Sequence, residues 1–151
     1  MRRGFEIITD YQDKGINLPV RKTSGASGYD IEAAEDTIIP VYKPNIKPTL
    51  IPTGIKAYCE SDEYIMLVNR SSGPKKGLLM ANGIGIIDHD YYNNEGNEGH
   101  IYFQYFNCTD HDIEIKKGDI IGQAIFQKFL ITDNDISENI RIGGFGSTDR
   151  K

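Results

Sequence analysis

The sequence has no tryptophan, only two cysteines and no apolar run long enough to cross a membrane. A transmembrane helix needs about 20 mostly apolar residues, and the N-terminus lacks the apolar segment of a secretory signal. Cys59 and Cys108 lie far apart and form no C-x-x-C pair, which favours a reducing compartment over a disulfide framework. We therefore expect a cytoplasmic protein that does not enter a membrane, with both cysteines as buried thiols.

An excess of positive charge is also missing. The chain has 17 Lys and Arg residues against 22 Asp and Glu residues, a formal net charge of −5 and a pI near 5.2. Broad binding to DNA or RNA needs a basic surface that neutralises phosphates. We therefore expect no direct nucleic-acid binding, and any phosphate site must be local.

Helical periodicity is absent too, because no window of eleven residues shows a convincing 3.6-residue hydrophobic period. Four prolines between positions 40 and 52 break the sequence into short strands, and turn signals recur at the spacing of a sandwich or barrel. The expected class is all-β. With 151 residues, the chain is long enough for one core. We assign residues 1–130 to a β-barrel domain and the glycine-rich residues 131–151 to a flexible C-terminal arm.

The most informative stretch covers residues 82–91, where small and β-branched apolar residues lead to Asp88, Asp90 and a tyrosine. A Gly/Asn-rich bend at 92–99 and a strand-like segment at 100–106 follow, so the pattern predicts a β-hairpin with a functional tip. For the two aspartates taken alone, a solvated turn is an equally good interpretation, because Asp is common in turns.

Four further segments carry polar groups that could bind a ligand. A Gly/Ser-rich loop at 23–30 leads to Asp30, and residues 69–77 combine an arginine, two serines and two lysines in an anion-binding pattern. Gln123 lies within an apolar strand, where its amide needs a partner or a ligand. Phe145 stands among glycines near the C-terminus. Each segment also has a plainer interpretation, as a connector, a basic turn, a cross-strand hydrogen bond or a mobile tail.

Together, five segments resemble the motifs of the trimeric deoxyuridine triphosphate nucleotidohydrolases (dUTPases), in the same order and at similar separations. The resemblance extends over about residues 4–148. The five segments are residues 26–33, 70–73, 83–91, 118–123 and 143–148. Agreement at five ordered motifs is far more specific than any single match.

The resemblance implies a jelly-roll-like antiparallel β-barrel that assembles as a homotrimer, with three active sites that each use motifs from three chains. The implied reaction is Mg²⁺-dependent hydrolysis of dUTP to dUMP and pyrophosphate, which limits uracil incorporation into DNA and supplies dUMP for dTMP synthesis. Asp88 matches the general base that activates the attacking water at the α-phosphate. Asp30 matches the carboxylate that holds Mg²⁺ through coordinated water.

The resemblance also implies two sets of substrate-binding residues. Those for uracil and deoxyribose are Asn82, Gly83, Ile87, Tyr91 and Phe145. Those for the phosphates are Arg70, Ser71, Ser72, Gln123, Arg141, Gly146, Ser147 and Thr148. Tyr91 would discriminate against UTP, because a 2′-hydroxyl would clash with its ring. The three histidines lack zinc spacing and are treated as packing or surface residues.

Some features depart from the common family pattern. Asn69 stands where a proline is frequent, Gly73-Pro74 replaces a more apolar pair, and Arg141 lies one residue nearer the phenylalanine than usual. The 92–99 bend is longer than in many members and is a candidate surface for a regulatory protein partner, although a solvated loop is the simpler interpretation.

Two alternative functions remain. A dCTP deaminase of the same fold would need a carboxylic acid placed at C4 of cytosine, whereas residues 83–91 carry the hydrolase pattern. A nucleotide-sensing regulatory protein would bind dUTP and signal its presence to a partner.

Overall fold

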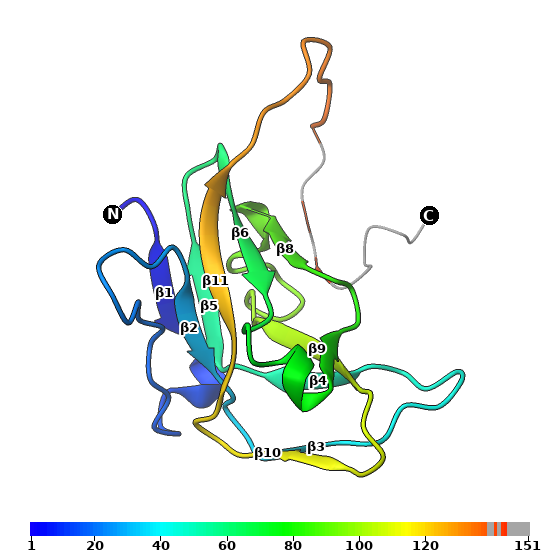
Figure 1. The fold of residues 1–151 in the computed structure, drawn as a ribbon. Coiled ribbons are helices and arrows are strands. Elements are labelled where there is room, and N and C mark those ends of the chain that lie inside the picture. Colours follow the sequence, from blue (N-terminus) through cyan, green and yellow to red (C-terminus); the bar gives the residue numbers. More distant parts are fainter. Residues whose placement is uncertain (139–140, 142, 145–151) are drawn as a thin grey trace.

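The computed structural model describes residues 1–138, 141, 143 and 144 (Figure 1). Within these residues the chain forms short strands and three single-turn 3-10 helices, which confirms the predicted all-β class. The strands are β1 (Gly4–Ile7), β2 (Tyr29–Glu32), β3 (Thr37–Ile39), β4 (Thr49–Pro52), β5 (Ile55–Tyr58), β6 (Glu63–Val68), β7 (Leu78–Met80), β8 (Gly85–Asp88), β9 (Tyr102–Asn107), β10 (Ile113–Ile115) and β11 (Ile120–Lys128). The 3-10 helices are η1 (Thr9–Tyr11), η2 (Pro74–Lys76) and η3 (His89–Tyr91).

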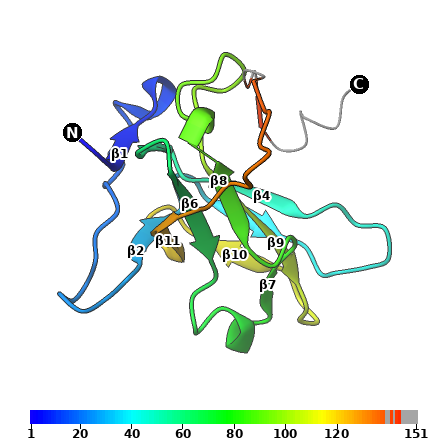
Figure 2. The ribbon, with the colours of Figure 1, turned by 90° about the horizontal axis from the view of Figure 1, so that it is seen from above.

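The strands pair antiparallel in four small sheets with the orders β1-β5, β10-β3, β2-β11-β6-β8 and β4-β9-β7. In Figures 1 and 2 β4 runs across the direction of β6. Buried side chains of the four-stranded sheet and of the β4-β9-β7 sheet form one core cluster. Fully buried side chains include Ile51, Ile65, Phe103 and Tyr105. The barrel thus has a solid apolar interior, so polar site residues must lie on its outer surface or at its ends.

Period-two patterning explains which strand residues face outwards. In β9 the burial alternates regularly, with Phe103 and Tyr105 buried and Tyr102, Gln104 and Phe106 partly exposed. In β6, Ile65 and Leu67 face the core in the same way. The outer faces of β6 and β9 are therefore available for a binding site.

The prediction of a β-hairpin over residues 82–106 is wrong, because its two arms belong to different sheets. β8 pairs with β6, whereas β9 pairs with β4 and β7. The register places Ile87 beside Ile65 and Gly85 beside Leu67. A methyl group at Gly85 would lie 3.1 Å from the Leu67 side chain, so the glycine allows this close pairing. β8 and β9 diverge as a result, and a cavity opens where a hairpin ladder was expected.

The 92–99 loop folds back on itself and packs against β1 and β5. The backbone N–H of Asn93 donates to the Glu98 carbonyl at 3.1 Å, which closes the loop. On its outer side, Lys56 Nζ donates to Asn93 Oδ1 at 2.6 Å and to Glu98 Oε1 at 2.8 Å. Glu98 also accepts from the Thr9 backbone N–H, and Tyr92 donates its hydroxyl proton to Glu6. The loop is therefore attached to the barrel by charged and polar contacts.

These contacts predict that Glu98→Gln destabilises the protein by about 1–2 kcal/mol at pH 7, because Glu98 forms charge-assisted hydrogen bonds. The Lys56 hydrogen bond is the main factor that lowers the pKa of Glu98 in the folded state. A lowered folded-state pKa stabilises the protein above the unfolded pKa of about 4.3, and this stabilisation disappears as the pH falls through the folded value. Urea unfolding at pH 7 and at pH 3 should show the difference between variant and wild type shrinking in acid. The exposed Glu95→Gln is the matched control, and an equal loss in both variants would contradict the assignment.

The two cysteines are both free, but only Cys59 is buried. Burial raises the pKa of its thiol to about 11. Cys108 is exposed, so the expectation of two buried thiols is wrong for this residue, which comes just after β9 ends. The described part of the chain contains no helix long and apolar enough to span a membrane.

Candidate active site

A cavity of about 370 Å³ lies between β8 and β9, where the two sheets diverge. Five residues predicted for the site line it, namely Asn82, Ile87, Asp88, Tyr91 and Arg141. They come from the turn before β8, from β8 itself, from η3 and from the chain beyond β11. The structure therefore brings the predicted base, sugar-binding ring and base-reading residue into one place.

Asp88 is the last residue of β8 and points outwards, with 59% of its side chain exposed. Its partner across the sheet is Tyr64 of β6. An exposed carboxylate at the rim of a cavity can contact both solvent and ligand, as a group that accepts a proton from water must.

Arg141 binds the two carboxylates at this rim. Its Nη2 donates to Asp88, its Nε donates to Asp90 Oδ1 at 2.8 Å, and its Nη1 donates to the Gly143 carbonyl at 3.1 Å. Burial lowers the pKa of Arg141, but the hydrogen bonds and charges of the two aspartates outweigh this and raise the pKa above its ordinary value. After β11 the chain extends away from the barrel and returns beside β8, which allows this contact (Figure 1).

Tyr91 is the buried wall of the cavity, with only 4% of the residue exposed. Its hydroxyl donates to the His100 carbonyl at 2.5 Å and accepts from Asn97 Nδ2 at 2.8 Å. Burial is the main factor that raises the pKa of Tyr91, so the phenol is neutral at pH 7. A neutral, fixed ring is suited to contact with an apolar part of a ligand such as a sugar.

The turn before β8 carries Asn82 and Gly83. Gly83 has a φ of +72°, and the N–H of Ile84 donates to the Asn82 carbonyl at 2.8 Å. A methyl group at Gly83 would meet no other atom within 4 Å. The glycine is therefore required by its positive φ, and not by the close packing of a neighbouring group. Gly83 flanks the cavity without lining it.

Several other residues that line the cavity were not among the site residues predicted from the sequence. They are Leu67, Met80, Gly85, Ile86, Tyr102, Gln104 and Gly144. The alternation within residues 102–106 was a signal for two of them, because it places Tyr102 and Gln104 on the same outward face. Only the pairing of the strands reveals that this face borders Asp88.

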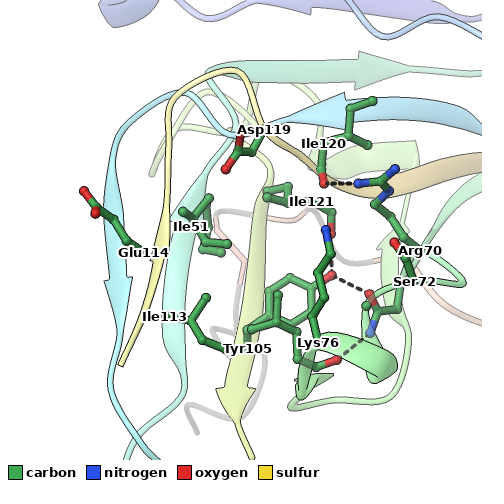
Figure 3. Close-up of a pocket in the computed structure, with 14 residues that line it drawn as sticks. Ile51, Arg70, Ser72, Lys76, Tyr105, Ile113, Glu114, Asp119, Ile120 and Ile121 are labelled. Atoms are coloured by element: carbon green, nitrogen blue, oxygen red, sulfur yellow. Dashed lines mark hydrogen bonds between the residues drawn. The ribbon is translucent and has the colours of Figure 1, made fainter. Parts of the chain in front are cut away.

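The predicted phosphate-binding segment lies elsewhere, at a second cavity of about 240 Å³ (Figure 3). Arg70 and Ser72 line it, and Arg70 Nη1 donates to the Ile120 carbonyl at 3.2 Å. Lys76, one of the two lysines of the predicted anion-binding segment, also faces this cavity, although the family resemblance did not assign it a role. Ser71 is exposed and does not line it.

The two unusual features of this segment, Asn69 and Gly73, depend on each other. Asn69 Nδ2 donates to the Leu78 carbonyl at 2.9 Å, and its Oδ1 accepts from the Tyr105 hydroxyl at 3.2 Å. A methyl group at Gly73 would lie 2.0 Å from Asn69 Oδ1. The Asn69 side chain therefore occupies the space that any larger residue at 73 would need, and it anchors the loop to β7 and β9.

Asp30 and Gln123 are neighbours on the outer face of the four-stranded sheet, because they are directly paired in β2 and β11. Gln123 in turn pairs with Val68 at the end of β6, just before Arg70. Lys22 Nζ lies 3.7 Å from Asp30 Oδ2. Asp30, Gln123 and Arg70 thus lie near one another at one end of this sheet, whereas Arg141, also predicted to bind phosphate, contacts Asp88.

The strand register gives the separation of the two groups. Asp30, Gln123 and Val68 are in one row across β2, β11 and β6, whereas Asp88 of β8 pairs with Tyr64, four residues away from Val68 along β6. With strands about 4.8 Å apart and a rise of about 3.3 Å per residue, Asp30 and Asp88 are about 20 Å apart. One chain therefore does not place these two carboxylates on one small ligand.

Among the described residues, no group of three His, Cys, Asp or Glu side chains is arranged to hold a metal ion. His100 is buried, and its Nε2 accepts a hydrogen bond from the Gly54 N–H at 2.9 Å, while burial lowers its pKa to about 4. His111 is exposed and His89 contacts the Cys59 carbonyl. A lone carboxylate such as Asp30 suits an ion held mostly by ligand oxygens and water. Phe145, Gly146, Ser147 and Thr148 lie outside the described residues.

Comparison with known proteins identifies the family of this chain. The dUTPase family model matches residues 14–149. The deoxyuridine 5′-triphosphate nucleotidohydrolase of Lactococcus lactis is 48% identical over 149 residues, which cover 97% of each chain. That of Arabidopsis thaliana is 33% identical and covers 95% of this chain and 82% of the relative.

Solved structures show the same relationship. The crystal structure of dUTPase from Streptococcus mutans has 45% identity and a TM-score of 0.80, covering 87% of this chain and 99% of its own. The dUTPase from phage phi11 of S. aureus shares the fold at 16% identity, with a TM-score of 0.71. The fold thus defines a jelly-roll-type β protein of the class to which these solved dUTPases belong. The chain belongs to the dUTPase family, and it is an enzyme of the deoxyuridine 5′-triphosphate nucleotidohydrolase type.

Proposed function

We propose that the protein hydrolyses dUTP to dUMP and pyrophosphate at active sites shared between the subunits of a homotrimer. The observation that carries the proposal is the strand register, which corresponds to a backbone separation of about 20 Å along the sheet between Asp30 and Asp88 of one chain. Mg²⁺ lies about 2 Å from its oxygen ligands, so its carboxylate and the base must lie close to one triphosphate. Two copies of the chain meet this condition if one supplies Asp88 and the other supplies Asp30.

In this mechanism Asp88 accepts a proton from the water that attacks the α-phosphorus, and the bond to the bridging oxygen of pyrophosphate breaks. A carboxylate with an ordinary pKa is ionised at neutral pH but weakly basic, so the position of the water contributes much of the rate. The Arg141 guanidinium must release the Asp88 carboxylate before the attacking water can donate a hydrogen bond to it. Bound Mg²⁺ would neutralise negative charge on the phosphates, and Asp30 would hold it through water.

The cavity between β8 and β9 would bind the nucleoside. Tyr91 forms a rigid wall against the deoxyribose, where a ribose 2′-hydroxyl has no space. Asn82, Gly83 and the adjoining main chain would pair with the edge of uracil, and Ile87 closes the apolar side. Cytosine would leave these polar groups mispaired, and this reduces the binding free energy more than the loss of an apolar contact does.

The phosphate chain would extend to a neighbouring subunit. Arg70, Ser71, Ser72 and Gln123 supply a guanidinium, two hydroxyls and an amide along the ends of β6 and β11, which can bind phosphate oxygens. We propose that Arg141, released from Asp88 and Asp90, joins Gly146, Ser147 and Thr148 at the γ-phosphate, with Phe145 over the uracil. The assignment of residues 131–151 as a closing arm remains a prediction.

Size-exclusion chromatography with light scattering tests the shared site directly. Activity should elute with a species of three subunits, because a single chain does not place Asp30 and Asp88 on the same substrate. Each fraction should be assayed for pyrophosphate release from dUTP at once, so that assembly in the assay does not mask a monomer. Activity in a species near the 17.0 kDa chain mass would contradict the proposal.

The dUTPase assignment leaves two accompanying roles as predictions. Hydrolysis of dUTP would limit uracil incorporation into DNA and supply dUMP for dTMP synthesis. A cytoplasmic location is compatible with two free cysteines. The 92–99 loop packs closely on the barrel, and no observation favours it as the surface for a regulatory partner.

A further inference from the structure

The 92–99 loop holds the Tyr91 ring from both ends. At the ring end, the hydroxyl accepts from Asn97 Nδ2 at 2.8 Å and donates to the His100 carbonyl at 2.5 Å. At the backbone end, the Tyr91 carbonyl accepts from Asn94 Nδ2 at 2.7 Å. A tyrosine bonded at its ring hydroxyl and at its backbone carbonyl has little freedom to rotate its ring away from the cavity that it lines.

The two asparagines that hold Tyr91 also hold each other. Asn94 Nδ2 donates to Asn97 Oδ1 at 2.8 Å, and Asn94 Oδ1 accepts from the N–H groups of Gly96 and Asn97. Asn97 Oδ1 accepts a second bond, from the Gly99 N–H at 3.0 Å. Asn94 is buried, so its amide atoms must be paired within the protein. The two amides therefore form a connected network whose geometry is set by the loop backbone.

The loop backbone adopts a conformation that few sequences allow. Asn93, Glu98 and Gly99 all have positive φ, at 56°, 64° and 87°. A methyl group at Gly99 would lie 2.9 Å from the Tyr91 carbonyl, so the end of the loop packs directly on the residue before its start. The outer contacts of Glu98 with Thr9 and Lys56 hold this conformation against the barrel.

We infer that Asn94 and Asn97 are positioning residues that fix the Tyr91 ring and thereby set the discrimination between dUTP and UTP. The inference rests on the proposed role of Tyr91 as the surface against which the deoxyribose packs. A tyrosine ring that can tilt makes room for a 2′-hydroxyl. A tyrosine that is held at its ring hydroxyl and at its backbone carbonyl does not. The lengthened loop thus contributes to the discrimination between dUTP and UTP by holding Tyr91, without itself contacting the nucleotide.

The test is Asn97→Asp, which removes the donor to the Tyr91 hydroxyl and keeps the acceptor for the Gly99 N–H. We expect the ratio of kcat/KM for dUTP to kcat/KM for UTP to fall about five- to tenfold, the effect of one lost hydrogen bond. Asn93→Asp is the matched control, because it makes the same change in the same loop at a side chain that contacts Lys56 on the outside. The control should keep the wild-type ratio.

The Tyr91→Phe variant provides an independent test if the Asn97→Asp variant does not fold. It should lower the same ratio, and Asn97→Asp should add nothing in the Tyr91→Phe background, because the bonded hydroxyl is already gone. A general loss of folding would instead lower the melting temperature and both rates together. If wild type prefers dUTP but neither variant changes the ratio, this inference is wrong and the proposed function stands. If wild type does not hydrolyse dUTP, the proposed function itself fails.

Discussion

Asp88→Asn should reduce pyrophosphate release from dUTP by about 10²–10⁴-fold, the usual contribution of a positioned general base. The amide keeps the size of the carboxylate at the rim of the cavity but does not accept a proton from water. The measurement is pyrophosphate release in the presence of Mg²⁺ from dUTP, dCTP, dTTP and UTP, with wild type and variant in parallel. Wild type should act on dUTP in preference to the other three.

Asp90→Asn is the matched control for this substitution. Asp90 lies two residues further on and also accepts a hydrogen bond from Arg141, so its amide variant loses a similar contact without removing the base. Its rate should fall far less. Binding of dUTP to Asp88→Asn should persist, since the cavity walls are unchanged. A wild-type rate that stays flat down to pH 4, or an active Asp88→Asn enzyme, would remove Asp88 as the base.

Two inactive variants should restore activity to each other when they assemble together. Asp88→Asn and Asp30→Asn each disable a different part of the site, and the structure places these parts about 20 Å apart in one chain. After co-refolding in equal amounts, about one site in four should receive an intact Asp88 from one chain and an intact Asp30 from another. The co-refolded sample should therefore recover about a quarter of the wild-type rate.

In the control for this experiment, the Asp30→Asn variant is co-refolded with a separate Arg70→Ala variant. These residues belong to the same end of the same sheet, so one chain would supply both to a given site, and mixing should restore nothing. Each variant alone should be assayed after the same refolding procedure to exclude recovery through residual activity. No recovery with Asp88→Asn and Asp30→Asn, in a sample shown to contain mixed oligomers, would place the whole site within one chain.

Local patterns were sufficient to predict the all-β class and the apolar strand that carries Gln123. Side-chain period and proline geometry are properties of the local chain, so short apolar segments between prolines and turns indicate strands without knowledge of their partners. The grouping of Asn82, Asp88 and Tyr91 was also predictable, since all three lie within the short segment of residues 82–91.

Strand pairing was not predictable in the same way. β8 and β9 follow one another in the chain, which favours a hairpin, but the fit of Gly85 against Leu67 directs β8 to β6 instead. Local sequence does not specify which distant strand provides the complementary face. For the same reason the role of Gln104, and the contact of Arg141 with Asp88, became visible only in the folded chain.

The 92–99 loop begins and ends at nearly the same point, since the Asn93 N–H donates to the Glu98 carbonyl and Gly99 packs against the Tyr91 carbonyl. The entropy of loop closure grows only slowly with length when the ends already meet. Such a segment can be gained or lost as a unit during evolution, because the strands on either side keep their register whatever lies between them. Relatives with a shorter connection would then retain the same barrel and differ only in how firmly they hold the tyrosine that we propose packs against the sugar.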